Sequence, residues 1–282
     1  MFRLSDLTAP RALVCKTPTD PLASMQCQLL LGNVQGQQSH VYKSSISGVG
    51  DVLVKVLKPH LRPLKGYDDV VSMEVSLRQS GVPVAELLSY HEWVDFGVTQ
   101  NAIIYRFYSG GDLFTQILRL HQSKSICAQR TEFIAYSMAK MLCTCLATLH
   151  TNGWIHADIK PENIFLSHDI ESDSCQAYLG DFGNAVRIGT SISPFTTGTP
   201  HYFPKQDFRN FNGPAHPSVD MYSVGKLLHV FDRHVHKMSP HAESVIGRLI
   251  RHNADERPTA EEMLSTHLPE WFLHIDSHAR TT

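Results

Sequence analysis

The sequence lacks the cysteine patterns and charge blocks that mark several classes of protein. Its six cysteines are scattered and include no C-x-x-C pair, so neither a zinc ribbon nor a disulfide framework is indicated. Cys143 and Cys145 lie two apart in a helical pattern, and we expect them to be buried free thiols in a reducing compartment. No long basic block occurs and the formal net charge is −2, so nothing favours a nucleic-acid partner.

Long apolar runs are also missing. The N-terminus shows no sustained apolar run of the kind that forms a signal peptide, and no stretch is expected to reach the about 20 apolar residues that span a bilayer. Hydrophobic residues make up 42% and charged residues 18% of 282 residues, enough apolar material for one large domain or for two lobes that share a cleft. We therefore expect a soluble cytoplasmic or nuclear protein with no membrane partner.

The most informative stretch is a short loop that follows an apolar, helix-like run. It reads Ile155-His156-Ala157-Asp158-Ile159-Lys160-Pro161-Glu162-Asn163. Asp158, Lys160 and Asn163 place a carboxylate, an ammonium and an amide on one loop. Phosphoryl transfer needs these groups, because a carboxylate orients the hydroxyl nucleophile, a cation neutralises the moving phosphoryl group, and oxygen atoms bind magnesium. The loop resembles the catalytic loop H-R-D-x-K-P-E-N of the eukaryotic protein kinase family, with Ala157 in place of the arginine.

The resemblance continues after this loop. Asp181-Phe182-Gly183 follows a strand-like run, as the D-F-G motif does in protein kinases. The resemblance implies that Asp158 and Lys160 are catalytic, and that Asp181 and Asn163 hold Mg²⁺. Lys160, two residues after Asp158, is typical of the serine/threonine type. Glu162 lies where some kinases recognise a basic residue upstream of the target, although an exposed glutamate is common.

The region from residue 26 to 57 has three β-like runs separated by glycine-containing turns, as in an antiparallel meander. Lys55 resembles the lysine that binds the α- and β-phosphates of ATP, and Glu74 occupies the position of its partner glutamate. A solvent-facing lysine on a strand would show the same alternation. In the loop that covers the phosphates only the central glycine, Gly36, survives when the stretch is aligned on Val41, and an ordinary hairpin explains it equally well.

A segment that begins at Arg106 resembles the hinge of a kinase and the start of its C-terminal lobe. The resemblance implies that backbone groups of Arg106 and Tyr108 contact the adenine. It also implies that Asp112 bonds a ribose hydroxyl and that Phe165 supports the adenine from below. A turn followed by a helix N-cap explains the glycines before Asp112 as well, and the two interpretations are compatible.

The activation segment is expected from Asp181 to about Gln206, and it departs from the family pattern near its end. Gly198-Thr199-Pro200-His201-Tyr202 is close to the G-T-x-x-Y of serine/threonine kinases, but Phe203-Pro204-Lys205 stands where A-P-E is expected. In the family the glutamate of A-P-E pairs with a late arginine, which matches Arg257 here. Because the glutamate is missing or displaced to Gln206, the contact that anchors this part of the C-lobe must be rebuilt or weaker. Asp220 resembles the aspartate that ties the catalytic loop down from behind.

These features predict an α+β, bilobal protein-kinase-like fold, with a small N-lobe of antiparallel sheet plus one helix and a larger, mostly helical C-lobe. Apolar spacings of three and four predict helices at 113–122 and 131–151, and a last helix at 260–264. The expected regions are an N-terminal arm at 1–25, the N-lobe at 26–108, the C-lobe at 109–269 and a C-terminal tail at 270–282.

The resemblance implies a divergent serine/threonine protein kinase that uses ATP and Mg²⁺ to phosphorylate a protein substrate. Because Ala157 replaces the arginine that an activation-loop phosphate neutralises in many kinases, we expect activity without phosphorylation of this loop. The compact length and altered motifs also fit a kinase that a virus or bacterial pathogen uses in a host cell. The sequence leaves the oligomeric state open.

Two other functions are kept as alternatives. A pseudokinase, acting as a nucleotide-binding scaffold or interaction module, is favoured by the reduced glycine loop, by Leu53 where kinases usually have alanine, and by the altered A-P-E. None of these changes removes a group that touches the reacting phosphate or the metal. A small-molecule kinase of related fold is disfavoured by residues 198–202, which suit a protein substrate.

Overall fold

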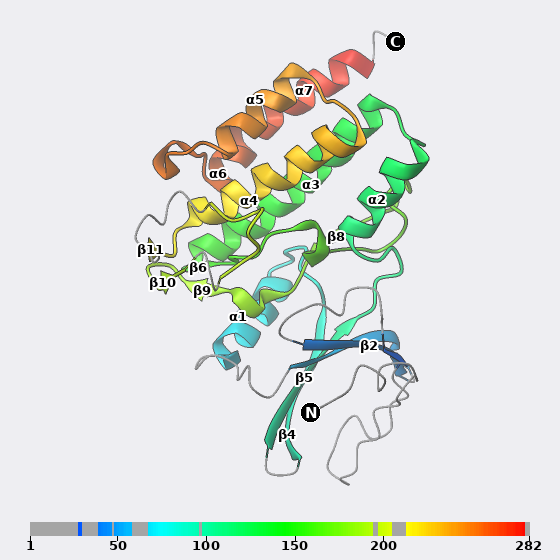
Figure 1. Cartoon of the computed structure of the whole chain (residues 1–282), viewed down its shortest axis with the longest axis vertical. Coiled ribbons are helices and arrows are strands. Elements are labelled where there is room, and N and C mark those ends of the chain that lie inside the picture. Colours follow the sequence, from blue (N-terminus) through cyan, green and yellow to red (C-terminus); the bar gives the residue numbers. More distant parts are fainter. Residues whose placement is uncertain are drawn as a thin grey trace. The chain divides into compact units, whose positions relative to one another are not determined.

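The computed structural model describes residues 28–29, 39–46, 48–57, 67–95, 98–193, 197–204 and 213–279. Gly36 and the end of the activation segment around Gln206 lie outside these residues. The chain divides into two compact units (Figure 1), which are Met1–Val75 with Ala85–Phe107 and Ser76–Val84 with Tyr108–Thr282. The lobe boundaries expected from the sequence stay predictions, since Ser76–Val84 lies inside the expected N-lobe and falls in the second unit.

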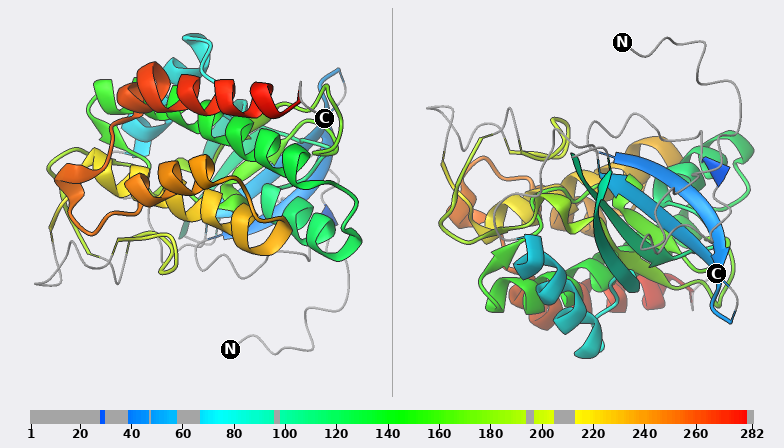
Figure 2. Two further views of the ribbon diagram at one scale, coloured as in Figure 1. Left: turned by 90° about the horizontal axis from the view of Figure 1, so that it is seen from above. Right: turned by 90° about the horizontal axis from the view of Figure 1, so that it is seen from below.

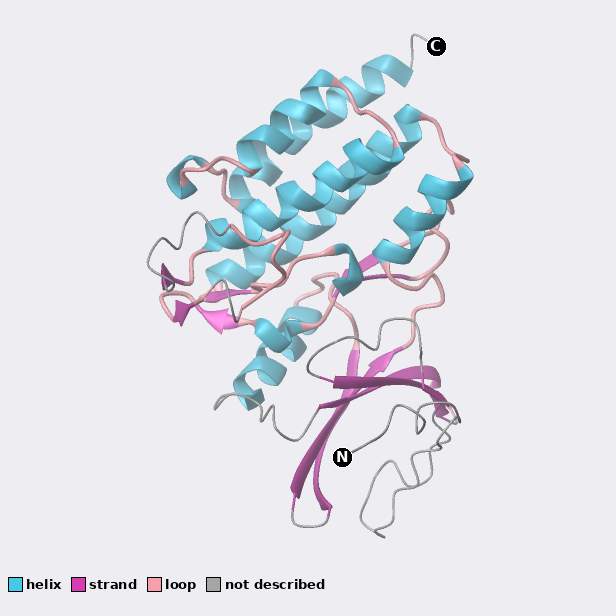
Figure 3. Ribbon diagram, in the orientation of Figure 1, coloured by secondary structure: helices cyan, strands magenta, loops and turns pink. Residues whose placement is uncertain are grey.

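The first unit is built on an antiparallel sheet (Figure 3). Its strand order is β1-β2-β3-β5-β4. Its strands are β1 (Gln28–Leu29), β2 (Ser39–Ile46), β3 (Gly50–Leu57), β4 (Leu87–Asp95) and β5 (Val98–Arg106). Alternate residues of β3 and β5 form one apolar core, because Val52, Val54 and Ile104 are at most 2% exposed. Helix α1 (Tyr67–Gln79) begins in this unit, and its last turn is counted with the second.

The second unit is mostly helical (Figure 2). Its helices include α2 (Leu113–Ser123), α3 (Ala128–Thr151), α4 (Pro217–Val230), α5 (Pro240–Leu249), α6 (Ala260–Glu262) and α7 (Leu268–Ala279). One-turn π-helices follow α4 (Phe231–Val235) and α6 (Met263–His267). Short antiparallel pairs join β6 (Trp154–Ile155) to β9 (Val186–Arg187), β7 (Ile164–Leu166) to β8 (Ala177–Leu179), and β10 (Ser191–Ile192) to β11 (Gly213–Pro214). A sheet with one helix and a mostly helical unit confirm the predicted fold class.

Helix α3 is the central element of the second unit, since it packs against α4, α6 and α7. By length and composition alone it is apolar enough to cross a membrane, contrary to the expectation that no such stretch exists. More than half of that stretch is buried inside the unit, as in the core helix of a globular fold. Cys143 and Cys145 lie on this helix as free, buried thiols, and burial raises the pKa of Cys143 to about 12 and that of Cys145 further.

The C-terminal end differs from the sequence prediction. A last helix at 260–264 and a tail from residue 270 were expected, but α7 continues to Ala279. The reason is the burial of Trp271, which is 0% exposed and donates its indole N–H to Glu132 of α3 at 2.8 Å. The ring of Tyr136 meets Trp271 edge-on at 5.7 Å. This packing anchors α7 to α3, so the predicted tail is wrong over the described residues.

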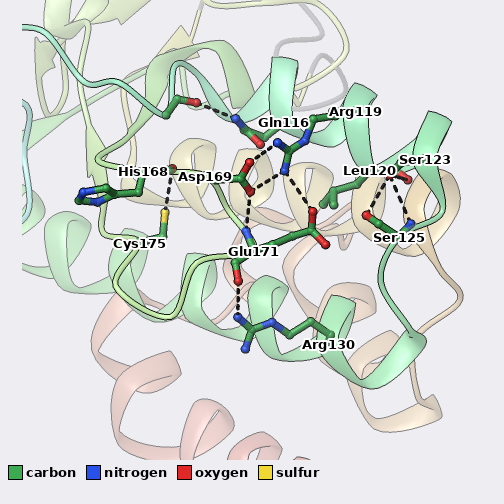
Figure 4. A network of polar contacts seen from close by, with 11 residues as sticks. Gln116, Arg119, Leu120, Ser123, Ser125, Arg130, His168, Asp169, Glu171 and Cys175 are labelled. Atoms are coloured by element: carbon green, nitrogen blue, oxygen red, sulfur yellow. Dashed lines mark hydrogen bonds and ion pairs between the residues drawn. The ribbon is translucent and has the colours of Figure 1, made fainter.

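The connection between β7 and β8, residues 167–176, is a polar loop that two arginines fasten to helices (Figure 4). Arg119 of α2 binds both carboxylate oxygens of Asp169 and lies 3.2 Å from Glu171. Arg130 of α3 donates to the carbonyl of Glu171 at 3.1 Å and to Asp173 at 2.8 Å. The hydrogen bond from Arg119 lowers the pKa of Asp169. Because these charges are partly exposed, the pairs hold the loop in place and add little to overall stability.

Candidate active site

The backbone of the predicted catalytic loop is held by Asp220, which lies in the first turn of α4 and is 0% exposed. Its carboxylate accepts hydrogen bonds from the backbone N–H groups of His156 and Ala157, each at 2.8 Å, and lies 2.9 Å from Nε2 of His150. Ala157 has φ 62, a backbone conformation that non-glycine residues adopt only where the surroundings fix it. Asp220 supplies that constraint, which confirms its predicted role.

The ring of His156 connects the loop to the segment before the D-F-G motif. Its Nδ1 accepts from the N–H of Asp158 at 3.2 Å, so its Nε2 carries the proton and donates to the carbonyl of Gly180 at 3.1 Å. The ring is 0% exposed and packs on Phe182, with 4.8 Å between the ring centroids. The loop and the D-F-G motif are therefore one packed assembly.

The carboxylate of Asp158 is the centre of a hydrogen-bond network and is 6% exposed. Its Oδ2 accepts from Nζ of Lys160 at 2.8 Å, from Asn163 at 3.2 Å and from Asn184 at 3.3 Å. Its Oδ1 accepts from the hydroxyl of Thr199 at 2.7 Å. Lys160 also donates to the Thr199 hydroxyl at 2.9 Å, so the three side chains form a closed triangle. Such a carboxylate is fixed in orientation and can act only as a hydrogen-bond acceptor in its ionised form.

The two predicted magnesium ligands lie on neighbouring segments. The carbonyl of Asn163 accepts from the N–H of Gly180, at 2.9 Å, directly before Asp181. Asp181 has φ 61 and ψ 65, and a Cβ added to Gly183 would lie 3.2 Å from its Oδ1. The amide nitrogen of Asn163 points to Asp158, at 2.8 Å from its carbonyl, which leaves Oδ1 of Asn163 for a cation.

These residues fit a magnesium ion that is bound jointly by the protein and by the phosphates of a nucleotide. Mg²⁺ prefers oxygen donors and usually takes one or two protein ligands, with phosphates and water completing the octahedron. Among the described residues, no group of three or more His, Cys, Asp or Glu side chains gathers to form a site made by protein alone. One carboxylate and one amide, Asp181 and Asn163, fit the one or two protein ligands that a magnesium ion takes when a nucleotide supplies the others.

Three of the predicted nucleotide contacts lie in the second unit. The ring of Tyr108 packs on Tyr178 at 4.7 Å and is stacked with Phe165 at 6.3 Å. Asp112 caps α2, since its two carboxylate oxygens accept from the N–H of Thr115 at 2.8 Å and from its hydroxyl at 3.1 Å. The cap expected as one of two compatible interpretations is thus present, and the ribose contact stays a prediction.

The remaining predicted contacts lie in the first unit. Lys55 of β3 is half-buried and aligns with Val41 of β2 and Ile103 of β5. Glu74 of α1 is 2% exposed and accepts a hydrogen bond from the hydroxyl of Tyr105 at 3.2 Å. The ion pair between Lys55 and Glu74 stays a prediction, as does the meeting of these groups with Asp181 around one nucleotide.

Arg106, predicted to offer its backbone to the adenine, is the last residue of β5. Its N–H donates to the carbonyl of Glu86 at 2.9 Å, and its guanidinium pairs with the Glu86 side chain. The backbone N–H is thus already used within the first unit. The contact of Arg106 with adenine stays a prediction.

Arg257, whose anchor was expected to be rebuilt or weaker because of the altered A-P-E, is held by several groups among the described residues. The guanidinium donates to the carbonyls of Arg251 at 2.8 Å, Ser218 at 3.1 Å and His252 at 3.3 Å. It also lies over the ring of Tyr222, 4.9 Å from the centroid. Among the described residues, backbone carbonyls and an aromatic face thus bind this cation, and the position of the expected glutamate lies outside them.

Sequence reasoning missed three residues of the network. Thr199 was assigned to the substrate-docking motif and not to the site, although a hydroxyl in G-T-x-x-Y could have suggested a partner for the carboxylate of Asp158. Asn184 directly follows the D-F-G motif and His150 lies near the end of α3, and neither position carries a signal in a single sequence. All three act through tertiary contacts, with Asp158 for Thr199 and Asn184 and with Asp220 for His150.

Comparison with known proteins agrees with this geometry. Residues 30–232 match the family model of the protein kinase domain. The serine/threonine-protein kinase ArnS of Sulfolobus acidocaldarius is 34% identical over 141 residues, which cover 45% of this chain and 22% of that protein. The serine/threonine-protein kinase chk-2 of Caenorhabditis elegans is 27% identical over 203 residues, 69% of this chain and 40% of the relative. The human serine/threonine-protein kinase DCLK3 is 29% identical over 168 residues, 59% of this chain and 24% of the relative. The chain thus spans less than half the length of each of these relatives, and since the family model matches most of its residues, it belongs to the protein kinase family.

Proposed function

We propose that this protein is an active serine/threonine protein kinase that transfers the γ-phosphate of ATP to a hydroxyl group of a protein substrate. One observation carries the proposal, the closed triangle of Asp158, Lys160 and Thr199. Removing an acid and a cation from water costs free energy, and packing alone would be better served by apolar side chains. Their presence in one buried cluster therefore favours a chemical role.

The residues of this chain divide the chemistry between them. Asp158 would accept the proton of the incoming serine or threonine hydroxyl as its oxygen attacks the γ-phosphorus, while the bond from that phosphorus to the β–γ bridging oxygen breaks and ADP leaves. Lys160, held by Asp158 and Thr199, would neutralise charge on the transferred phosphoryl group. Asn163 and Asp181 would hold Mg²⁺, which supplies charge neutralisation between the phosphates. Lys55, if paired with Glu74 as predicted, would bind the α- and β-phosphates.

We also propose that activity does not require phosphorylation of the activation loop. Ala157 is 1% exposed and offers a methyl group where many kinases have an arginine that receives the phosphate. Arg187 of β9, a cation near the start of the activation segment, lies over the ring of Trp154 at 4.2 Å and donates to the carbonyl of Asn152 at 3.3 Å. Both observations support an activation segment that is held without a phosphate.

Glu162 suggests a preference for substrates with a basic residue near the target hydroxyl. Its Oε2 is buried and has no hydrogen-bond donor among the described residues. Burial, and then the charge of Glu162, raise the pKa of Tyr202 to about 12, so its phenol stays neutral beside this carboxylate. A lysine or arginine of a substrate would satisfy it. Comparison of peptides with arginine or alanine before the target serine, in the native protein and in Glu162→Gln, tests this preference.

The main test is a transfer assay with purified protein, Mg²⁺, labelled ATP and a generic substrate such as casein or myelin basic protein. Phosphorylation by the native protein, lost in Asp158→Asn and Lys55→Met, is the expected result. Phosphatase treatment of the enzyme should leave its rate unchanged. Thermal stabilisation by Mg·ATP without any transfer would instead support the pseudokinase.

A further inference from the structure

An apolar cluster surrounds the position where the family has its arginine. It is formed by residues that are each at most 5% exposed, namely Ile155, Ala157, Ile192, Phe203, Ala215 and Val219. They come from the catalytic loop, from the middle and the end of the activation segment, from the residue that follows β11 and from α4. The cluster therefore joins the activation segment to the catalytic loop through buried apolar surface, which is stabilising in proportion to the area removed from water.

Two members of the cluster differ from the family pattern in side-chain size, one being smaller and the other larger than the family residue. Ala157 is small where H-R-D has an arginine, and Phe203 is large where A-P-E has an alanine. Both side chains are buried in the same cluster, at 1% and 3% exposure. Since protein interiors are close-packed, a small side chain at one position makes room for a large one at the other.

The ring of Phe203 lies directly against the backbone that carries Thr199. A Cβ added to Gly198 would lie 2.7 Å from Cδ2 of Phe203 and 2.6 Å from the carbonyl oxygen of Ala157. Gly198 is therefore enclosed between Ala157 and Phe203. Its φ of 71 is a left-handed conformation that also favours glycine. The next residue, Thr199, donates its hydroxyl to Asp158 at 2.7 Å.

The backbone on either side of the cluster is also tied down. In the first part of the activation segment, the N–H of Gly189 donates to the carbonyl of Ala215 at 2.8 Å, and the N–H of Ala215 donates to Thr190 at 2.7 Å. At the far end, the Ser223 hydroxyl of α4 donates to the carbonyl of Tyr202 at 2.8 Å. Phe203 thus lies between two segments whose backbones are fixed by hydrogen bonds.

We infer that Phe203 is a positioning residue that compensates for the missing arginine at position 157. Its ring packs into the volume beside Ala157 and presses on Gly198, and in this way it holds the hydroxyl of Thr199 on the carboxylate of Asp158. An apolar contact replaces the arginine–phosphate contact that orders this segment in other members of the family. The inference rests on the proposed kinase activity for its kinetic part and on packing alone for its structural part.

The kinetic test compares Phe203→Ala with Phe203→Leu and with a matched control, Phe231→Ala. Phe231 is 0% exposed and Phe203 is 3% exposed, so both rings are buried. Phe231, however, follows the last turn of α4, 11 residues from Asp220 or about 16 Å along the helix. Phe203→Ala should lower kcat about 10- to 100-fold through misplacement of Thr199, with KM for ATP unchanged. Phe203→Leu should retain most of kcat, and Phe231→Ala should lower the melting temperature without this loss of kcat.

The structural test is a double-mutant cycle on the melting temperature with Ala157→Arg, Phe203→Ala and the double variant. The arginine alone should be poorly tolerated because Phe203 occupies its space, and the double variant should be more stable than the two single changes predict by addition. Additive effects in the cycle, or a kcat of Phe203→Ala equal to that of Phe231→Ala, would overturn the inference. Absence of transfer in the unmodified protein would instead refute the proposed function, and the cycle would still decide the packing claim.

Discussion

Replacement of Asp220 by asparagine tests how far one buried carboxylate controls the catalytic loop. Asp220 accepts hydrogen bonds at both oxygens, with the N–H of Ala157 at Oδ1 and with the N–H of His156 and the ring of His150 at Oδ2. An amide of the same shape keeps one oxygen and replaces the other by an NH₂ group, which cannot accept. Whichever way the amide turns, at least one buried backbone N–H is left facing a donor.

The size of the effect follows from this count. A buried donor without an acceptor costs about 1–3 kcal/mol, a large share of the roughly 5–15 kcal/mol by which domains are stable. Because Ala157 has a strained φ of 62 and its N–H is one of the groups that Asp220 binds, the cost should also appear as a shift of the loop that carries Asp158. We expect Asp220→Asn to lower the urea midpoint and to lower kcat at least about tenfold, as ångström-scale misplacement of a catalytic group does.

A second buried aspartate provides the control. Asp232, in the π-helical turn after α4, is 6% exposed, accepts from the N–H of Met238 at 2.9 Å and pairs with Lys237 at 3.1 Å. Asp232→Asn should cost stability and leave kcat unchanged, measured by urea unfolding and by transfer at saturating ATP. If both asparagine variants lost stability equally and neither changed kcat, Asp220 would support the fold alone and the reasoning above would be refuted.

Three further predictions concern other parts of the second unit. Thr199→Val removes the donor to the catalytic carboxylate and should lower kcat about tenfold, whereas Thr199→Ser should restore it; equal rates in a transfer assay would contradict the triangle. Glu132→Ala leaves the indole of α7 and the N-cap of α5 without an acceptor and should cost about 2–5 kcal/mol in urea unfolding, with Glu132→Gln less affected. The pKa values of Cys143 and Cys145 are raised by burial, so these thiols should resist alkylation at pH 8 while the exposed Cys127 reacts. A thiol with a raised pKa in the folded state favours folding fully below its ordinary pKa, so stability should decline as the pH rises from about 9 toward 12; mapping of labelled peptides and unfolding curves at several pH values check both statements.

Local spacing explains which parts of the site could be predicted. Asp158, Lys160 and Asn163 belong to one short loop, so their order along the chain almost determines that they meet. The resemblance placed Asp220 correctly, because the family pattern contains that residue. The strands β7 and β8 were expected from their apolar residues, but β6, β9, β10 and β11 and the end of α7 were not predicted, since two-residue strands leave no periodicity and the burial of Trp271 depends on a partner on α3.

Contacts between distant segments could not be predicted for the same reason. Thr199 is 41 residues from Asp158, and Tyr105 is 31 residues from Glu74, so nothing in either segment alone indicates the bond. The pairing of Ala157 with Phe203 was visible in the sequence only as two separate departures from the family. Their common cause, shared volume in one cluster, exists only in the folded chain.

The hydroxyl of Thr199 has a consequence for control of the enzyme by covalent modification. Since this oxygen already contacts both Asp158 and Lys160, a phosphate attached to it would bring about two negative charges against the catalytic carboxylate and draw Lys160 away from it. Modification at this threonine would act as a brake, the opposite of the activation that loop phosphates bring elsewhere. Mass spectrometry of separated fractions should find the phosphorylated form among inactive molecules, and an active fraction rich in it would refute this conclusion.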